Sequence, residues 1–303
     1  MSNLIQRTLS GALYVAVVVA AILVHPIAFA AIFAVVSTLA VREFHVITGD
    51  ERYTRVFGML LNLLLFAGVG VWQFCNHMIA TNYVFETSSA QIIAFTYMVV
   101  LLFALVCVLA HYQSAKPAAH WGNLLAGQVM IALPFATMLI VLAYSKWLLL
   151  ALFVLLWTND TGAYCVGSLT AKRKNGNHKM SPHVSPKKSW EGLFGGAAFV
   201  LLAAWLLAHC GWFDCIDGWQ YTVQPSAKYW VALGFGLLAT VAGTLGDLME
   251  SLLKRSYGIK DSGRFLPGHG GVLDRFDSVL AVATVIAAAE CFVSLFPSIE
   301  NAI

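Results

Sequence analysis

Long apolar runs with almost no charge constrain this chain more than any other feature. A helix that spans a bilayer needs about 18 or more predominantly apolar residues, and such runs recur along the 303 residues. Only 11% of the residues are charged, whereas a soluble domain carries roughly 25%. A membrane β-barrel would alternate apolar and polar residues in segments of about ten, which these solid runs do not. The sequence predicts an all-α polytopic integral membrane protein, with the lipid bilayer as its surroundings.

Nine transmembrane helices are expected. Their ranges are 8–24, 27–41, 56–75, 91–110, 122–143, 146–168, 191–209, 229–250 and 275–296. Pro26 separates the first two, and Pro134 is expected to kink the fifth, because proline removes a helical hydrogen bond. No repeat or low-complexity linker divides the chain, so residues 1–303 are interpreted as a single membrane domain. Its N-terminal helical part covers 1–145 and its catalytic helical part covers 146–303.

The positions of the basic residues predict the orientation. With the N-terminus in the cytoplasm, all of the 18 Lys and Arg residues except Lys146 and Lys228 lie on the cytoplasmic side. Cytoplasmic loops of membrane proteins carry such an excess of cations. An N-in, C-out topology in a cytoplasmic (inner) membrane is therefore expected, and the short N-terminus favours a bacterial source.

The densest charge lies in the stretch Gly246–Asp277, between the last two expected spans. Asp247, Glu250, Ser251 and Lys254 recur at helical spacing and therefore share one helix face. A Glu250–Lys254 ion pair at a helix end explains part of this charge. It does not explain Asp247, which lies one turn deeper and has no adjacent cation in the sequence.

Asp274 and Asp277 open the ninth expected span. A helix N-terminus favours acidic side chains, so part of this pattern is ordinary capping. Two helix ends that each present a carboxylate to one cavity would also form an oxygen site suited to Mg²⁺, which takes one or two carboxylates and completes its shell with water and substrate phosphate. Asp247 and Asp274 are the predicted metal pair for Mg²⁺. A second, monovalent cation such as K⁺ is left open.

The cations between these acids suit a phosphate-rich ligand, since arginine binds phosphate in forked fashion and lysine as a point charge. The turn that contains His269 lacks the spacing of a P-loop, but its glycines bring backbone N–H groups close to an anion before a helix start. A histidine of this kind is more often structural. The candidate ligand residues of this segment are Lys254, Arg255, Lys260, Asp261, His269 and Arg275.

A second polar segment precedes this one. Asn159 and Asp160 place an amide and an acid inside an apolar span, and an ionisable residue within the membrane is a functional hypothesis by default. Downstream, Lys187 and Lys188 precede Ser189, an expected helix N-cap. The alternative is that both lysines only mark the cytoplasmic face.

The order of these residues resembles the signature of the phosphatidate cytidylyltransferases (CDP-diacylglycerol synthases). The matching pattern is Ser251-x-x-Lys254-Arg255, Lys260-Asp261 and His269-Gly270-Gly271-x-x-Asp274-Arg275-x-Asp277. Two further segments look similar, Asn159-Asp160-x-Gly162-Ala163-Tyr164 and Ser185-Pro186-Lys187-Lys188-x-Trp190-Glu191-Gly192. The match covers the C-terminal half, and residues 1–150 match only as hydrophobic spans. The stretch 171–178 departs from the family by being longer and more basic.

This resemblance implies an Mg²⁺-dependent nucleotidyltransferase that converts CTP and phosphatidate into CDP-diacylglycerol and diphosphate at a cytoplasm-facing site. It implies Asp247 and Asp274 as metal ligands, and it suggests catalytic roles for Ser251, Lys254 and Asp277. Lys187, Lys188, Lys254, Arg255 and Lys260 are expected on chemical grounds to bind phosphate. No nucleic-acid partner is expected, and a homodimer is left open.

Two other readings compete with this one. In an ion-coupled transporter, Asp160, Asp247 and Glu290 would line an ion path, and polar residues would be needed on both membrane faces. A CTP-dependent lipid (polyprenol) kinase, such as a dolichol kinase, shares a loosely similar membrane design. A CDP-alcohol phosphotransferase is disfavoured because its aspartate-rich DG-x-x-AR motif is absent.

Overall fold

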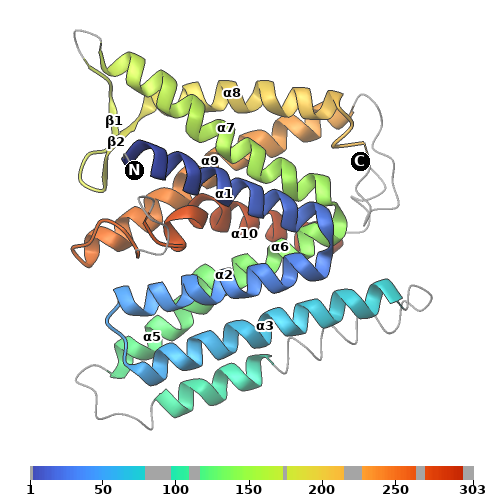
Figure 1. Cartoon of the computed structure of the whole chain (residues 1–303), viewed down its shortest axis with the longest axis vertical. Coiled ribbons are helices and arrows are strands. Elements are labelled where there is room, and N and C mark those ends of the chain that lie inside the picture. The colour runs from blue at the N-terminus through green and yellow to red at the C-terminus, as the bar shows by residue number, and fades with distance from the viewer. Residues whose placement is uncertain are drawn as a thin grey trace. The chain divides into compact units, whose positions relative to one another are not determined.

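The structure, a computed structural model, describes residues 3–78, 97–108, 117–172, 176–214, 227–263 and 270–295. These residues are almost entirely helical, with one two-stranded sheet (Figure 1). The chain forms two compact units. The first comprises Met1–Ile140 and Asp261–Arg275, and the second comprises Val141–Lys260 and Phe276–Ile303.

The first unit is a bundle of apolar helices. It contains α1 (Asn3–Val24), α2 (Pro26–Ile47), α3 (Arg52–Met78), a helix over Tyr97–Val108, and α5 (Pro117–Gly127). Apolar side chains from α3, the Tyr97–Val108 helix and α5 form one core cluster, whose buried members are Leu61, Leu101, Ala104, Leu105, Val108 and Leu124. Asn62 of α3 adds a buried polar contact by donating to Ser37 Oγ of α2 at 2.9 Å. The helix faces therefore pack as the apolar pattern predicts.

A π-helical turn lies just before Pro134, the residue at which the sequence predicts a kink. This turn, η1 (Gln128–Ala132), joins α5 to α6 (Leu133–Tyr144), and Leu133 N–H donates to Gln128 O across it. Proline cannot donate a backbone hydrogen bond, and such wider turns are a usual way for a helix to absorb the disruption. The Gln128 side chain is buried and donates to Gly58 O at 3.1 Å. The interruption therefore fixes the packing of this helix against α3.

A buried carboxylate closes the turn between α2 and α3. The Asp50 side chain accepts hydrogen bonds from His45 Nδ1 at 2.7 Å, His120 Nδ1 at 2.5 Å, Asn123 Nδ2 at 2.9 Å and Thr48 Oγ1 at 2.6 Å. Burial raises the pKa of Asp50, but these hydrogen bonds outweigh burial and lower its pKa to about 2. Asp50 therefore stays ionised while it ties the α2–α3 turn to α5.

The second unit is built on close helix contacts. It contains α7 (Lys146–Ala171), α8 (Trp190–His209), α9 (Ala227–Ser256) and most of α10 (Leu273–Leu295). α7 packs along α8, and α8 along α9. A Cβ added at Gly196 of α8 would lie 2.6 Å from Asn159 Oδ1 of α7. Small residues of this kind let membrane helices approach closely, and here they hold Asn159 against α8.

A short hairpin joins α7 to α8, which the sequence did not predict. β1 (Lys179–Ser181) pairs antiparallel with β2 (Ser185–Ser189), so that Lys179 lies opposite Ser189. The expected helix N-cap at Ser189 is confirmed, because its Oγ accepts from Gly192 N at 3.1 Å. The hairpin therefore delivers Lys187 and Lys188 directly to the start of α8.

Within the residues that the structure describes, six helices are long and apolar enough to cross a membrane. They are Pro26–Ile47, Arg52–Val71, Ala118–Ala143, Lys146–Ala171, Trp190–His209 and Ala227–Ser256. Two shorter apolar helices are Thr8–Val24 and Tyr97–Val108. The helices have the length and composition of an all-α integral membrane protein, as the sequence predicts.

Candidate functional site

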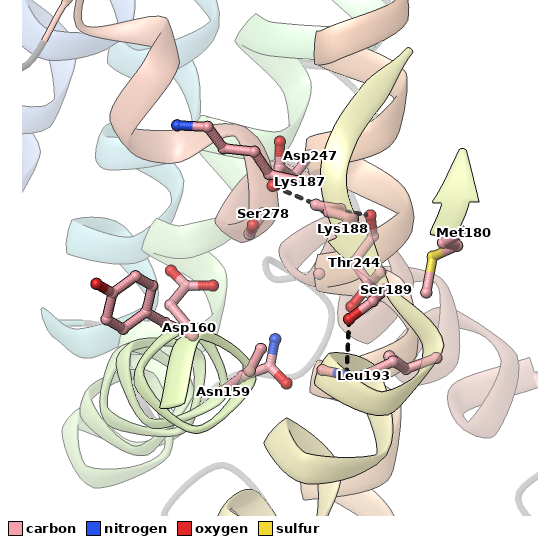
Figure 2. A pocket seen from close by; sticks show the side chains of 14 residues that line it. Asn159, Asp160, Met180, Lys187, Lys188, Ser189, Leu193, Thr244, Asp247 and Ser278 are labelled. Atoms are coloured by element: carbon pink, nitrogen blue, oxygen red, sulfur yellow. Dashed lines mark hydrogen bonds and ion pairs between the residues drawn. The ribbon is translucent and has the colours of Figure 1, made fainter. Parts of the chain in front are cut away.

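A cavity of about 200 Å³ lies within the second unit, and polar side chains from four elements line it. α7 supplies Asn159 and Asp160, β2 supplies Lys187 and Lys188, and α9 supplies Asp247, with Ser278 of α10 beside it. Figure 2 shows the two α7 residues across the cavity from Lys188, Thr244 and Asp247. The structure thus brings the two motif segments of the sequence together at one place.

Asp247 has no cation next to it in the sequence, but in the structure a lysine of the hairpin pairs with it. Lys188 Nζ lies 2.7 Å from Asp247 Oδ2 and donates to Thr244 O at 3.2 Å (Figure 2). The two charged side chains keep 22% and 33% of their surface exposed, so both remain open to a ligand. Ser251 Oγ, one turn later, donates to Asp247 Oδ1 at 3.3 Å. Asp247 is therefore held from both sides at the cavity wall.

Three carboxylates converge next to this ion pair. Asp247 and Glu250 of α9 and Asp277 of α10 each offer an oxygen, and these oxygens lie within 4.8 Å of one another. Glu250 is buried and pairs with Lys254 at 2.5 Å, which confirms the ion pair expected from the sequence. Like charges so close repel unless a cation is shared. Carboxylate oxygens are the ligands that Mg²⁺ uses in proteins, so this donor set fits a hard divalent cation.

Gly246 permits this convergence. A Cβ at this position would lie 2.6 Å from Ala281 Cβ and 2.7 Å from Asp277 O of α10. Any larger residue would push α9 away from α10. The glycine before Asp247 therefore sets the distance between the Asp247 and Asp277 carboxylates.

Arg255 lies apart from the cavity lining. Its exposed side chain donates to Val184 O at 3.4 Å and to Ile259 O at 3.0 Å, so it ties the hairpin turn to the end of α9. Lys260 is exposed at the end of the same connection. The structure gives these two cations no contact with the carboxylate cluster, and their predicted phosphate binding stays a prediction.

Asp261, Asp274 and Arg275 belong to the first unit. Asp274 Oδ2 accepts hydrogen bonds from Ser262 N and Gly271 N, both at 2.8 Å, which fixes the carboxylate at the start of α10. The predicted pairing of Asp274 with Asp247 joins the two units and stays a prediction. His269 lies outside the described residues.

Sequence reasoning missed several residues of the site. It placed Glu250 on the helix face of Asp247 but assigned it only to an ion pair with Lys254 and not to the metal site. Gly243, Thr244 and Ser278 carried no charge that would single them out, yet they line the cavity. Their role follows from helix packing, which the sequence of one chain does not show.

Comparison with known proteins gives the same indication. Residues 5–292 match the model of the cytidylyltransferase family. A phosphatidate cytidylyltransferase of Haemophilus influenzae is 33% identical over 298 residues, covering 91% of this chain and 94% of that protein.

Two staphylococcal proteins match a shorter region more closely. Phosphatidate cytidylyltransferases of Staphylococcus aureus (strain COL) and Staphylococcus epidermidis (strain ATCC 12228) are each 40% identical over 134 residues, or 44% of this chain. The matched region spans 45% of the length of each relative. Because the family model matches nearly the whole chain, from residue 5 to residue 292, the chain belongs to the cytidylyltransferase family.

Proposed function

We propose that this protein is a phosphatidate cytidylyltransferase, which forms CDP-diacylglycerol and diphosphate from CTP and phosphatidate. The observation that supports this most is the match to the H. influenzae phosphatidate cytidylyltransferase over 91% of the chain. The cavity agrees with it, because lysines of the hairpin and carboxylates of long apolar helices meet there. A soluble nucleotide can enter such a site while the tails of a lipid stay in the bilayer.

The reaction depends more on neutralising the phosphate charges than on a strong base. A phosphatidate oxygen attacks the α-phosphorus of CTP, and the bond from that phosphorus to the diphosphate breaks. The nucleophile is already an anion, so the barrier is repulsion between two polyanions and charge on the departing diphosphate. Lys187 and Lys188 are placed to neutralise phosphate at the cavity. Asn159 and Asp160 line the opposite wall and bound the space for the nucleotide.

We propose Mg²⁺ as the cofactor, with Asp247 and Asp274 as its ligands. Glu250 and Asp277 are the described carboxylates that gather beside Asp247. When bound, Mg²⁺ would screen the phosphate charges and polarise the reacting phosphoryl group. A second, monovalent cation such as K⁺ is left open in this proposal.

We further propose nine transmembrane helices with the N-terminus inside and the C-terminus outside. The six long apolar helices, the two shorter ones and α10 supply that number. The cationic bias of the loops supports an active site on the cytoplasmic side of a bacterial inner membrane. A single membrane domain and a homodimer also remain proposals.

The deciding experiment uses purified full-length protein with labelled CTP, phosphatidate and Mg²⁺. We expect labelled CDP-diacylglycerol to form in step with diphosphate. Release of CDP together with a phosphorylated alcohol would instead support the CTP-dependent lipid kinase. CTP turnover with neither product would contradict both.

Asp274→Asn tests the proposed metal pair. We expect it to abolish turnover while the protein stays folded, as judged by its melting temperature. Retained turnover would remove Asp274 from the metal site without affecting the proposed reaction.

A further inference from the structure

A buried glutamate from the N-terminal half contacts the signature loop, by which we mean the described residues 261–263 and 270–274. Glu43 lies near the C-terminal end of α2 and is only 8% exposed. Its Oε1 accepts from Val272 N at 3.0 Å, and its Oε2 accepts from Leu273 N at 2.9 Å and from Ser262 Oγ at 3.0 Å. These contacts join residues up to 230 positions apart within the first unit.

These hydrogen bonds satisfy the start of α10. The first N–H groups of a helix have no partner within the helix, and a carboxylate at that end is favoured by the helix dipole. Glu43 supplies acceptors to the N–H groups of Val272 and Leu273. Val272 and Leu273 are buried, so water does not reach their N–H groups and the acceptor has to come from another element.

Glu43 is linked to Asp274 through one residue. Ser262 donates its hydroxyl to Glu43, and the same oxygen accepts from Asp274 N at 3.3 Å. Ser262 N in turn donates to Asp274 Oδ2 at 2.8 Å. If Glu43 is displaced, the Ser262 hydroxyl loses its acceptor. Ser262 is then held less firmly, and its N–H is one of the two donors that fix Asp274 Oδ2.

Two glycines leave room for this arrangement. A Cβ at Gly263 would lie 2.5 Å from Glu43 Oε1, and one at Gly271 would collide with Glu43 Oε2 and Ser262 Oγ. Both glycines thus lie flush against the carboxylate. A side chain at either position would displace the Glu43 carboxylate, so both contacts require glycine.

We propose that Glu43 is a positioning residue that acts on Asp274 through Ser262. This inference rests on the proposed function for its effect on turnover, but the anchoring of the loop does not depend on it. Mutation of a residue that positions a metal ligand typically lowers metal affinity or activity by about 10–100-fold.

The test compares Glu43→Gln with Glu51→Gln in purified full-length protein. Glutamine keeps the shape of the side chain but turns an NH₂ group toward backbone donors, so one or more bonds are lost. Glu51 has 43% of its side chain exposed, and its substitution removes the same charge from the same unit. Two quantities are measured, the hydrogen exchange of residues 270–274 without ligands and the Mg²⁺ concentration that gives half-maximal turnover.

We expect Glu43→Gln to accelerate exchange and to raise the half-maximal Mg²⁺ concentration about tenfold, with the KM for phosphatidate unchanged. Gly271→Ala should reproduce both effects from the other side of the contact.

Unchanged exchange in Glu43→Gln, or equal effects in Glu51→Gln, would overturn the proposal. Faster exchange with an unchanged Mg²⁺ requirement would also overturn it, because Glu43 would then be only structural. A wild-type protein that makes no CDP-diacylglycerol would instead reject the proposed reaction, and the exchange measurement would still decide the anchoring.

Discussion

The two units surround their carboxylates in opposite ways. In the first unit, Glu43 accepts three hydrogen bonds and Asp50 accepts four, all from donors of the same unit. In the second unit, Asp247, Glu250 and Asp277 face one another. A carboxylate surrounded by donors stabilises the fold by itself. Carboxylates that face one another need a cation. The first arrangement holds the chain together, and the second is suited to binding.

The largest expected effect comes from the converging carboxylates. Asp247→Asn should lower kcat by more than about a hundredfold, since even partners outside the ligand shell cost about that much, while the melting temperature changes little. CDP-diacylglycerol formation and thermal unfolding measure the two quantities. Asp214→Asn, in an exposed ion pair with Lys228 at 2.7 Å, is the matched control and should leave turnover unchanged. Equal losses in both variants would contradict a specific role for the converging carboxylates, because Asp214 belongs to the same unit but not to their cluster.

Gly246→Ala tests whether helix approach creates the cluster. Its Cβ would overlap Ala281 and the backbone of Asp277, so we expect a loss of up to about 3 kcal/mol in stability, as for other overpacked sites, together with lower activity. Gly234→Ala changes the same helix where nothing lies within 4 Å and should be neutral or stabilising. Denaturation in detergent compares the two. Full activity in Gly246→Ala would show that the distance between α9 and α10 does not matter.

Asp50→Asn tests a carboxylate of the first unit by its pH dependence. Its folded pKa of about 2 lies below the ordinary value of 3.8, so its ionised form stabilises the fold at every pH above the ordinary value. That contribution, about 2 kcal/mol, is lost as the pH falls from about 4 to about 2. Unfolding free energies of wild type and variant should therefore differ at pH 7 and approach each other in acid. A constant difference would mean that packing, not charge, dominates.

The smallest effect is expected for the cation beside Asp247. Lys188→Gln should raise the KM for CTP about tenfold, which is the strength of one charge-assisted hydrogen bond. Lys228→Gln, whose ion pair with Asp214 has the same 2.7 Å separation, should change KM little because Lys228 is not among the residues that line the cavity. Steady-state kinetics at saturating phosphatidate separates the two. An unchanged KM in Lys188→Gln would restrict Lys188 to holding Asp247.

The sequence predicted the elements better than their contacts. Apolar length predicted the helices, and capping chemistry predicted Ser189 as an N-cap, because both depend on neighbours in the chain. The contact of Lys188 with Asp247 depends on a hairpin that brings distant residues together, and no local pattern encodes it. Glu43 was missed for the same reason. In the sequence it is one acid near the end of an apolar helix, and its partners lie 219 to 230 positions away.

The contact of Glu43 with the signature loop predicts how the C-terminal half would behave when it is expressed alone. All the recognisable motifs follow residue 146, which invites expression of the C-terminal half as a minimal enzyme. Such a fragment would carry the loop and Asp274 but leave the N–H groups of Val272 and Leu273 without their acceptor. Activity should return only when residues 1–145 are co-expressed, so the half of the chain that lacks motifs is required for the half that carries them.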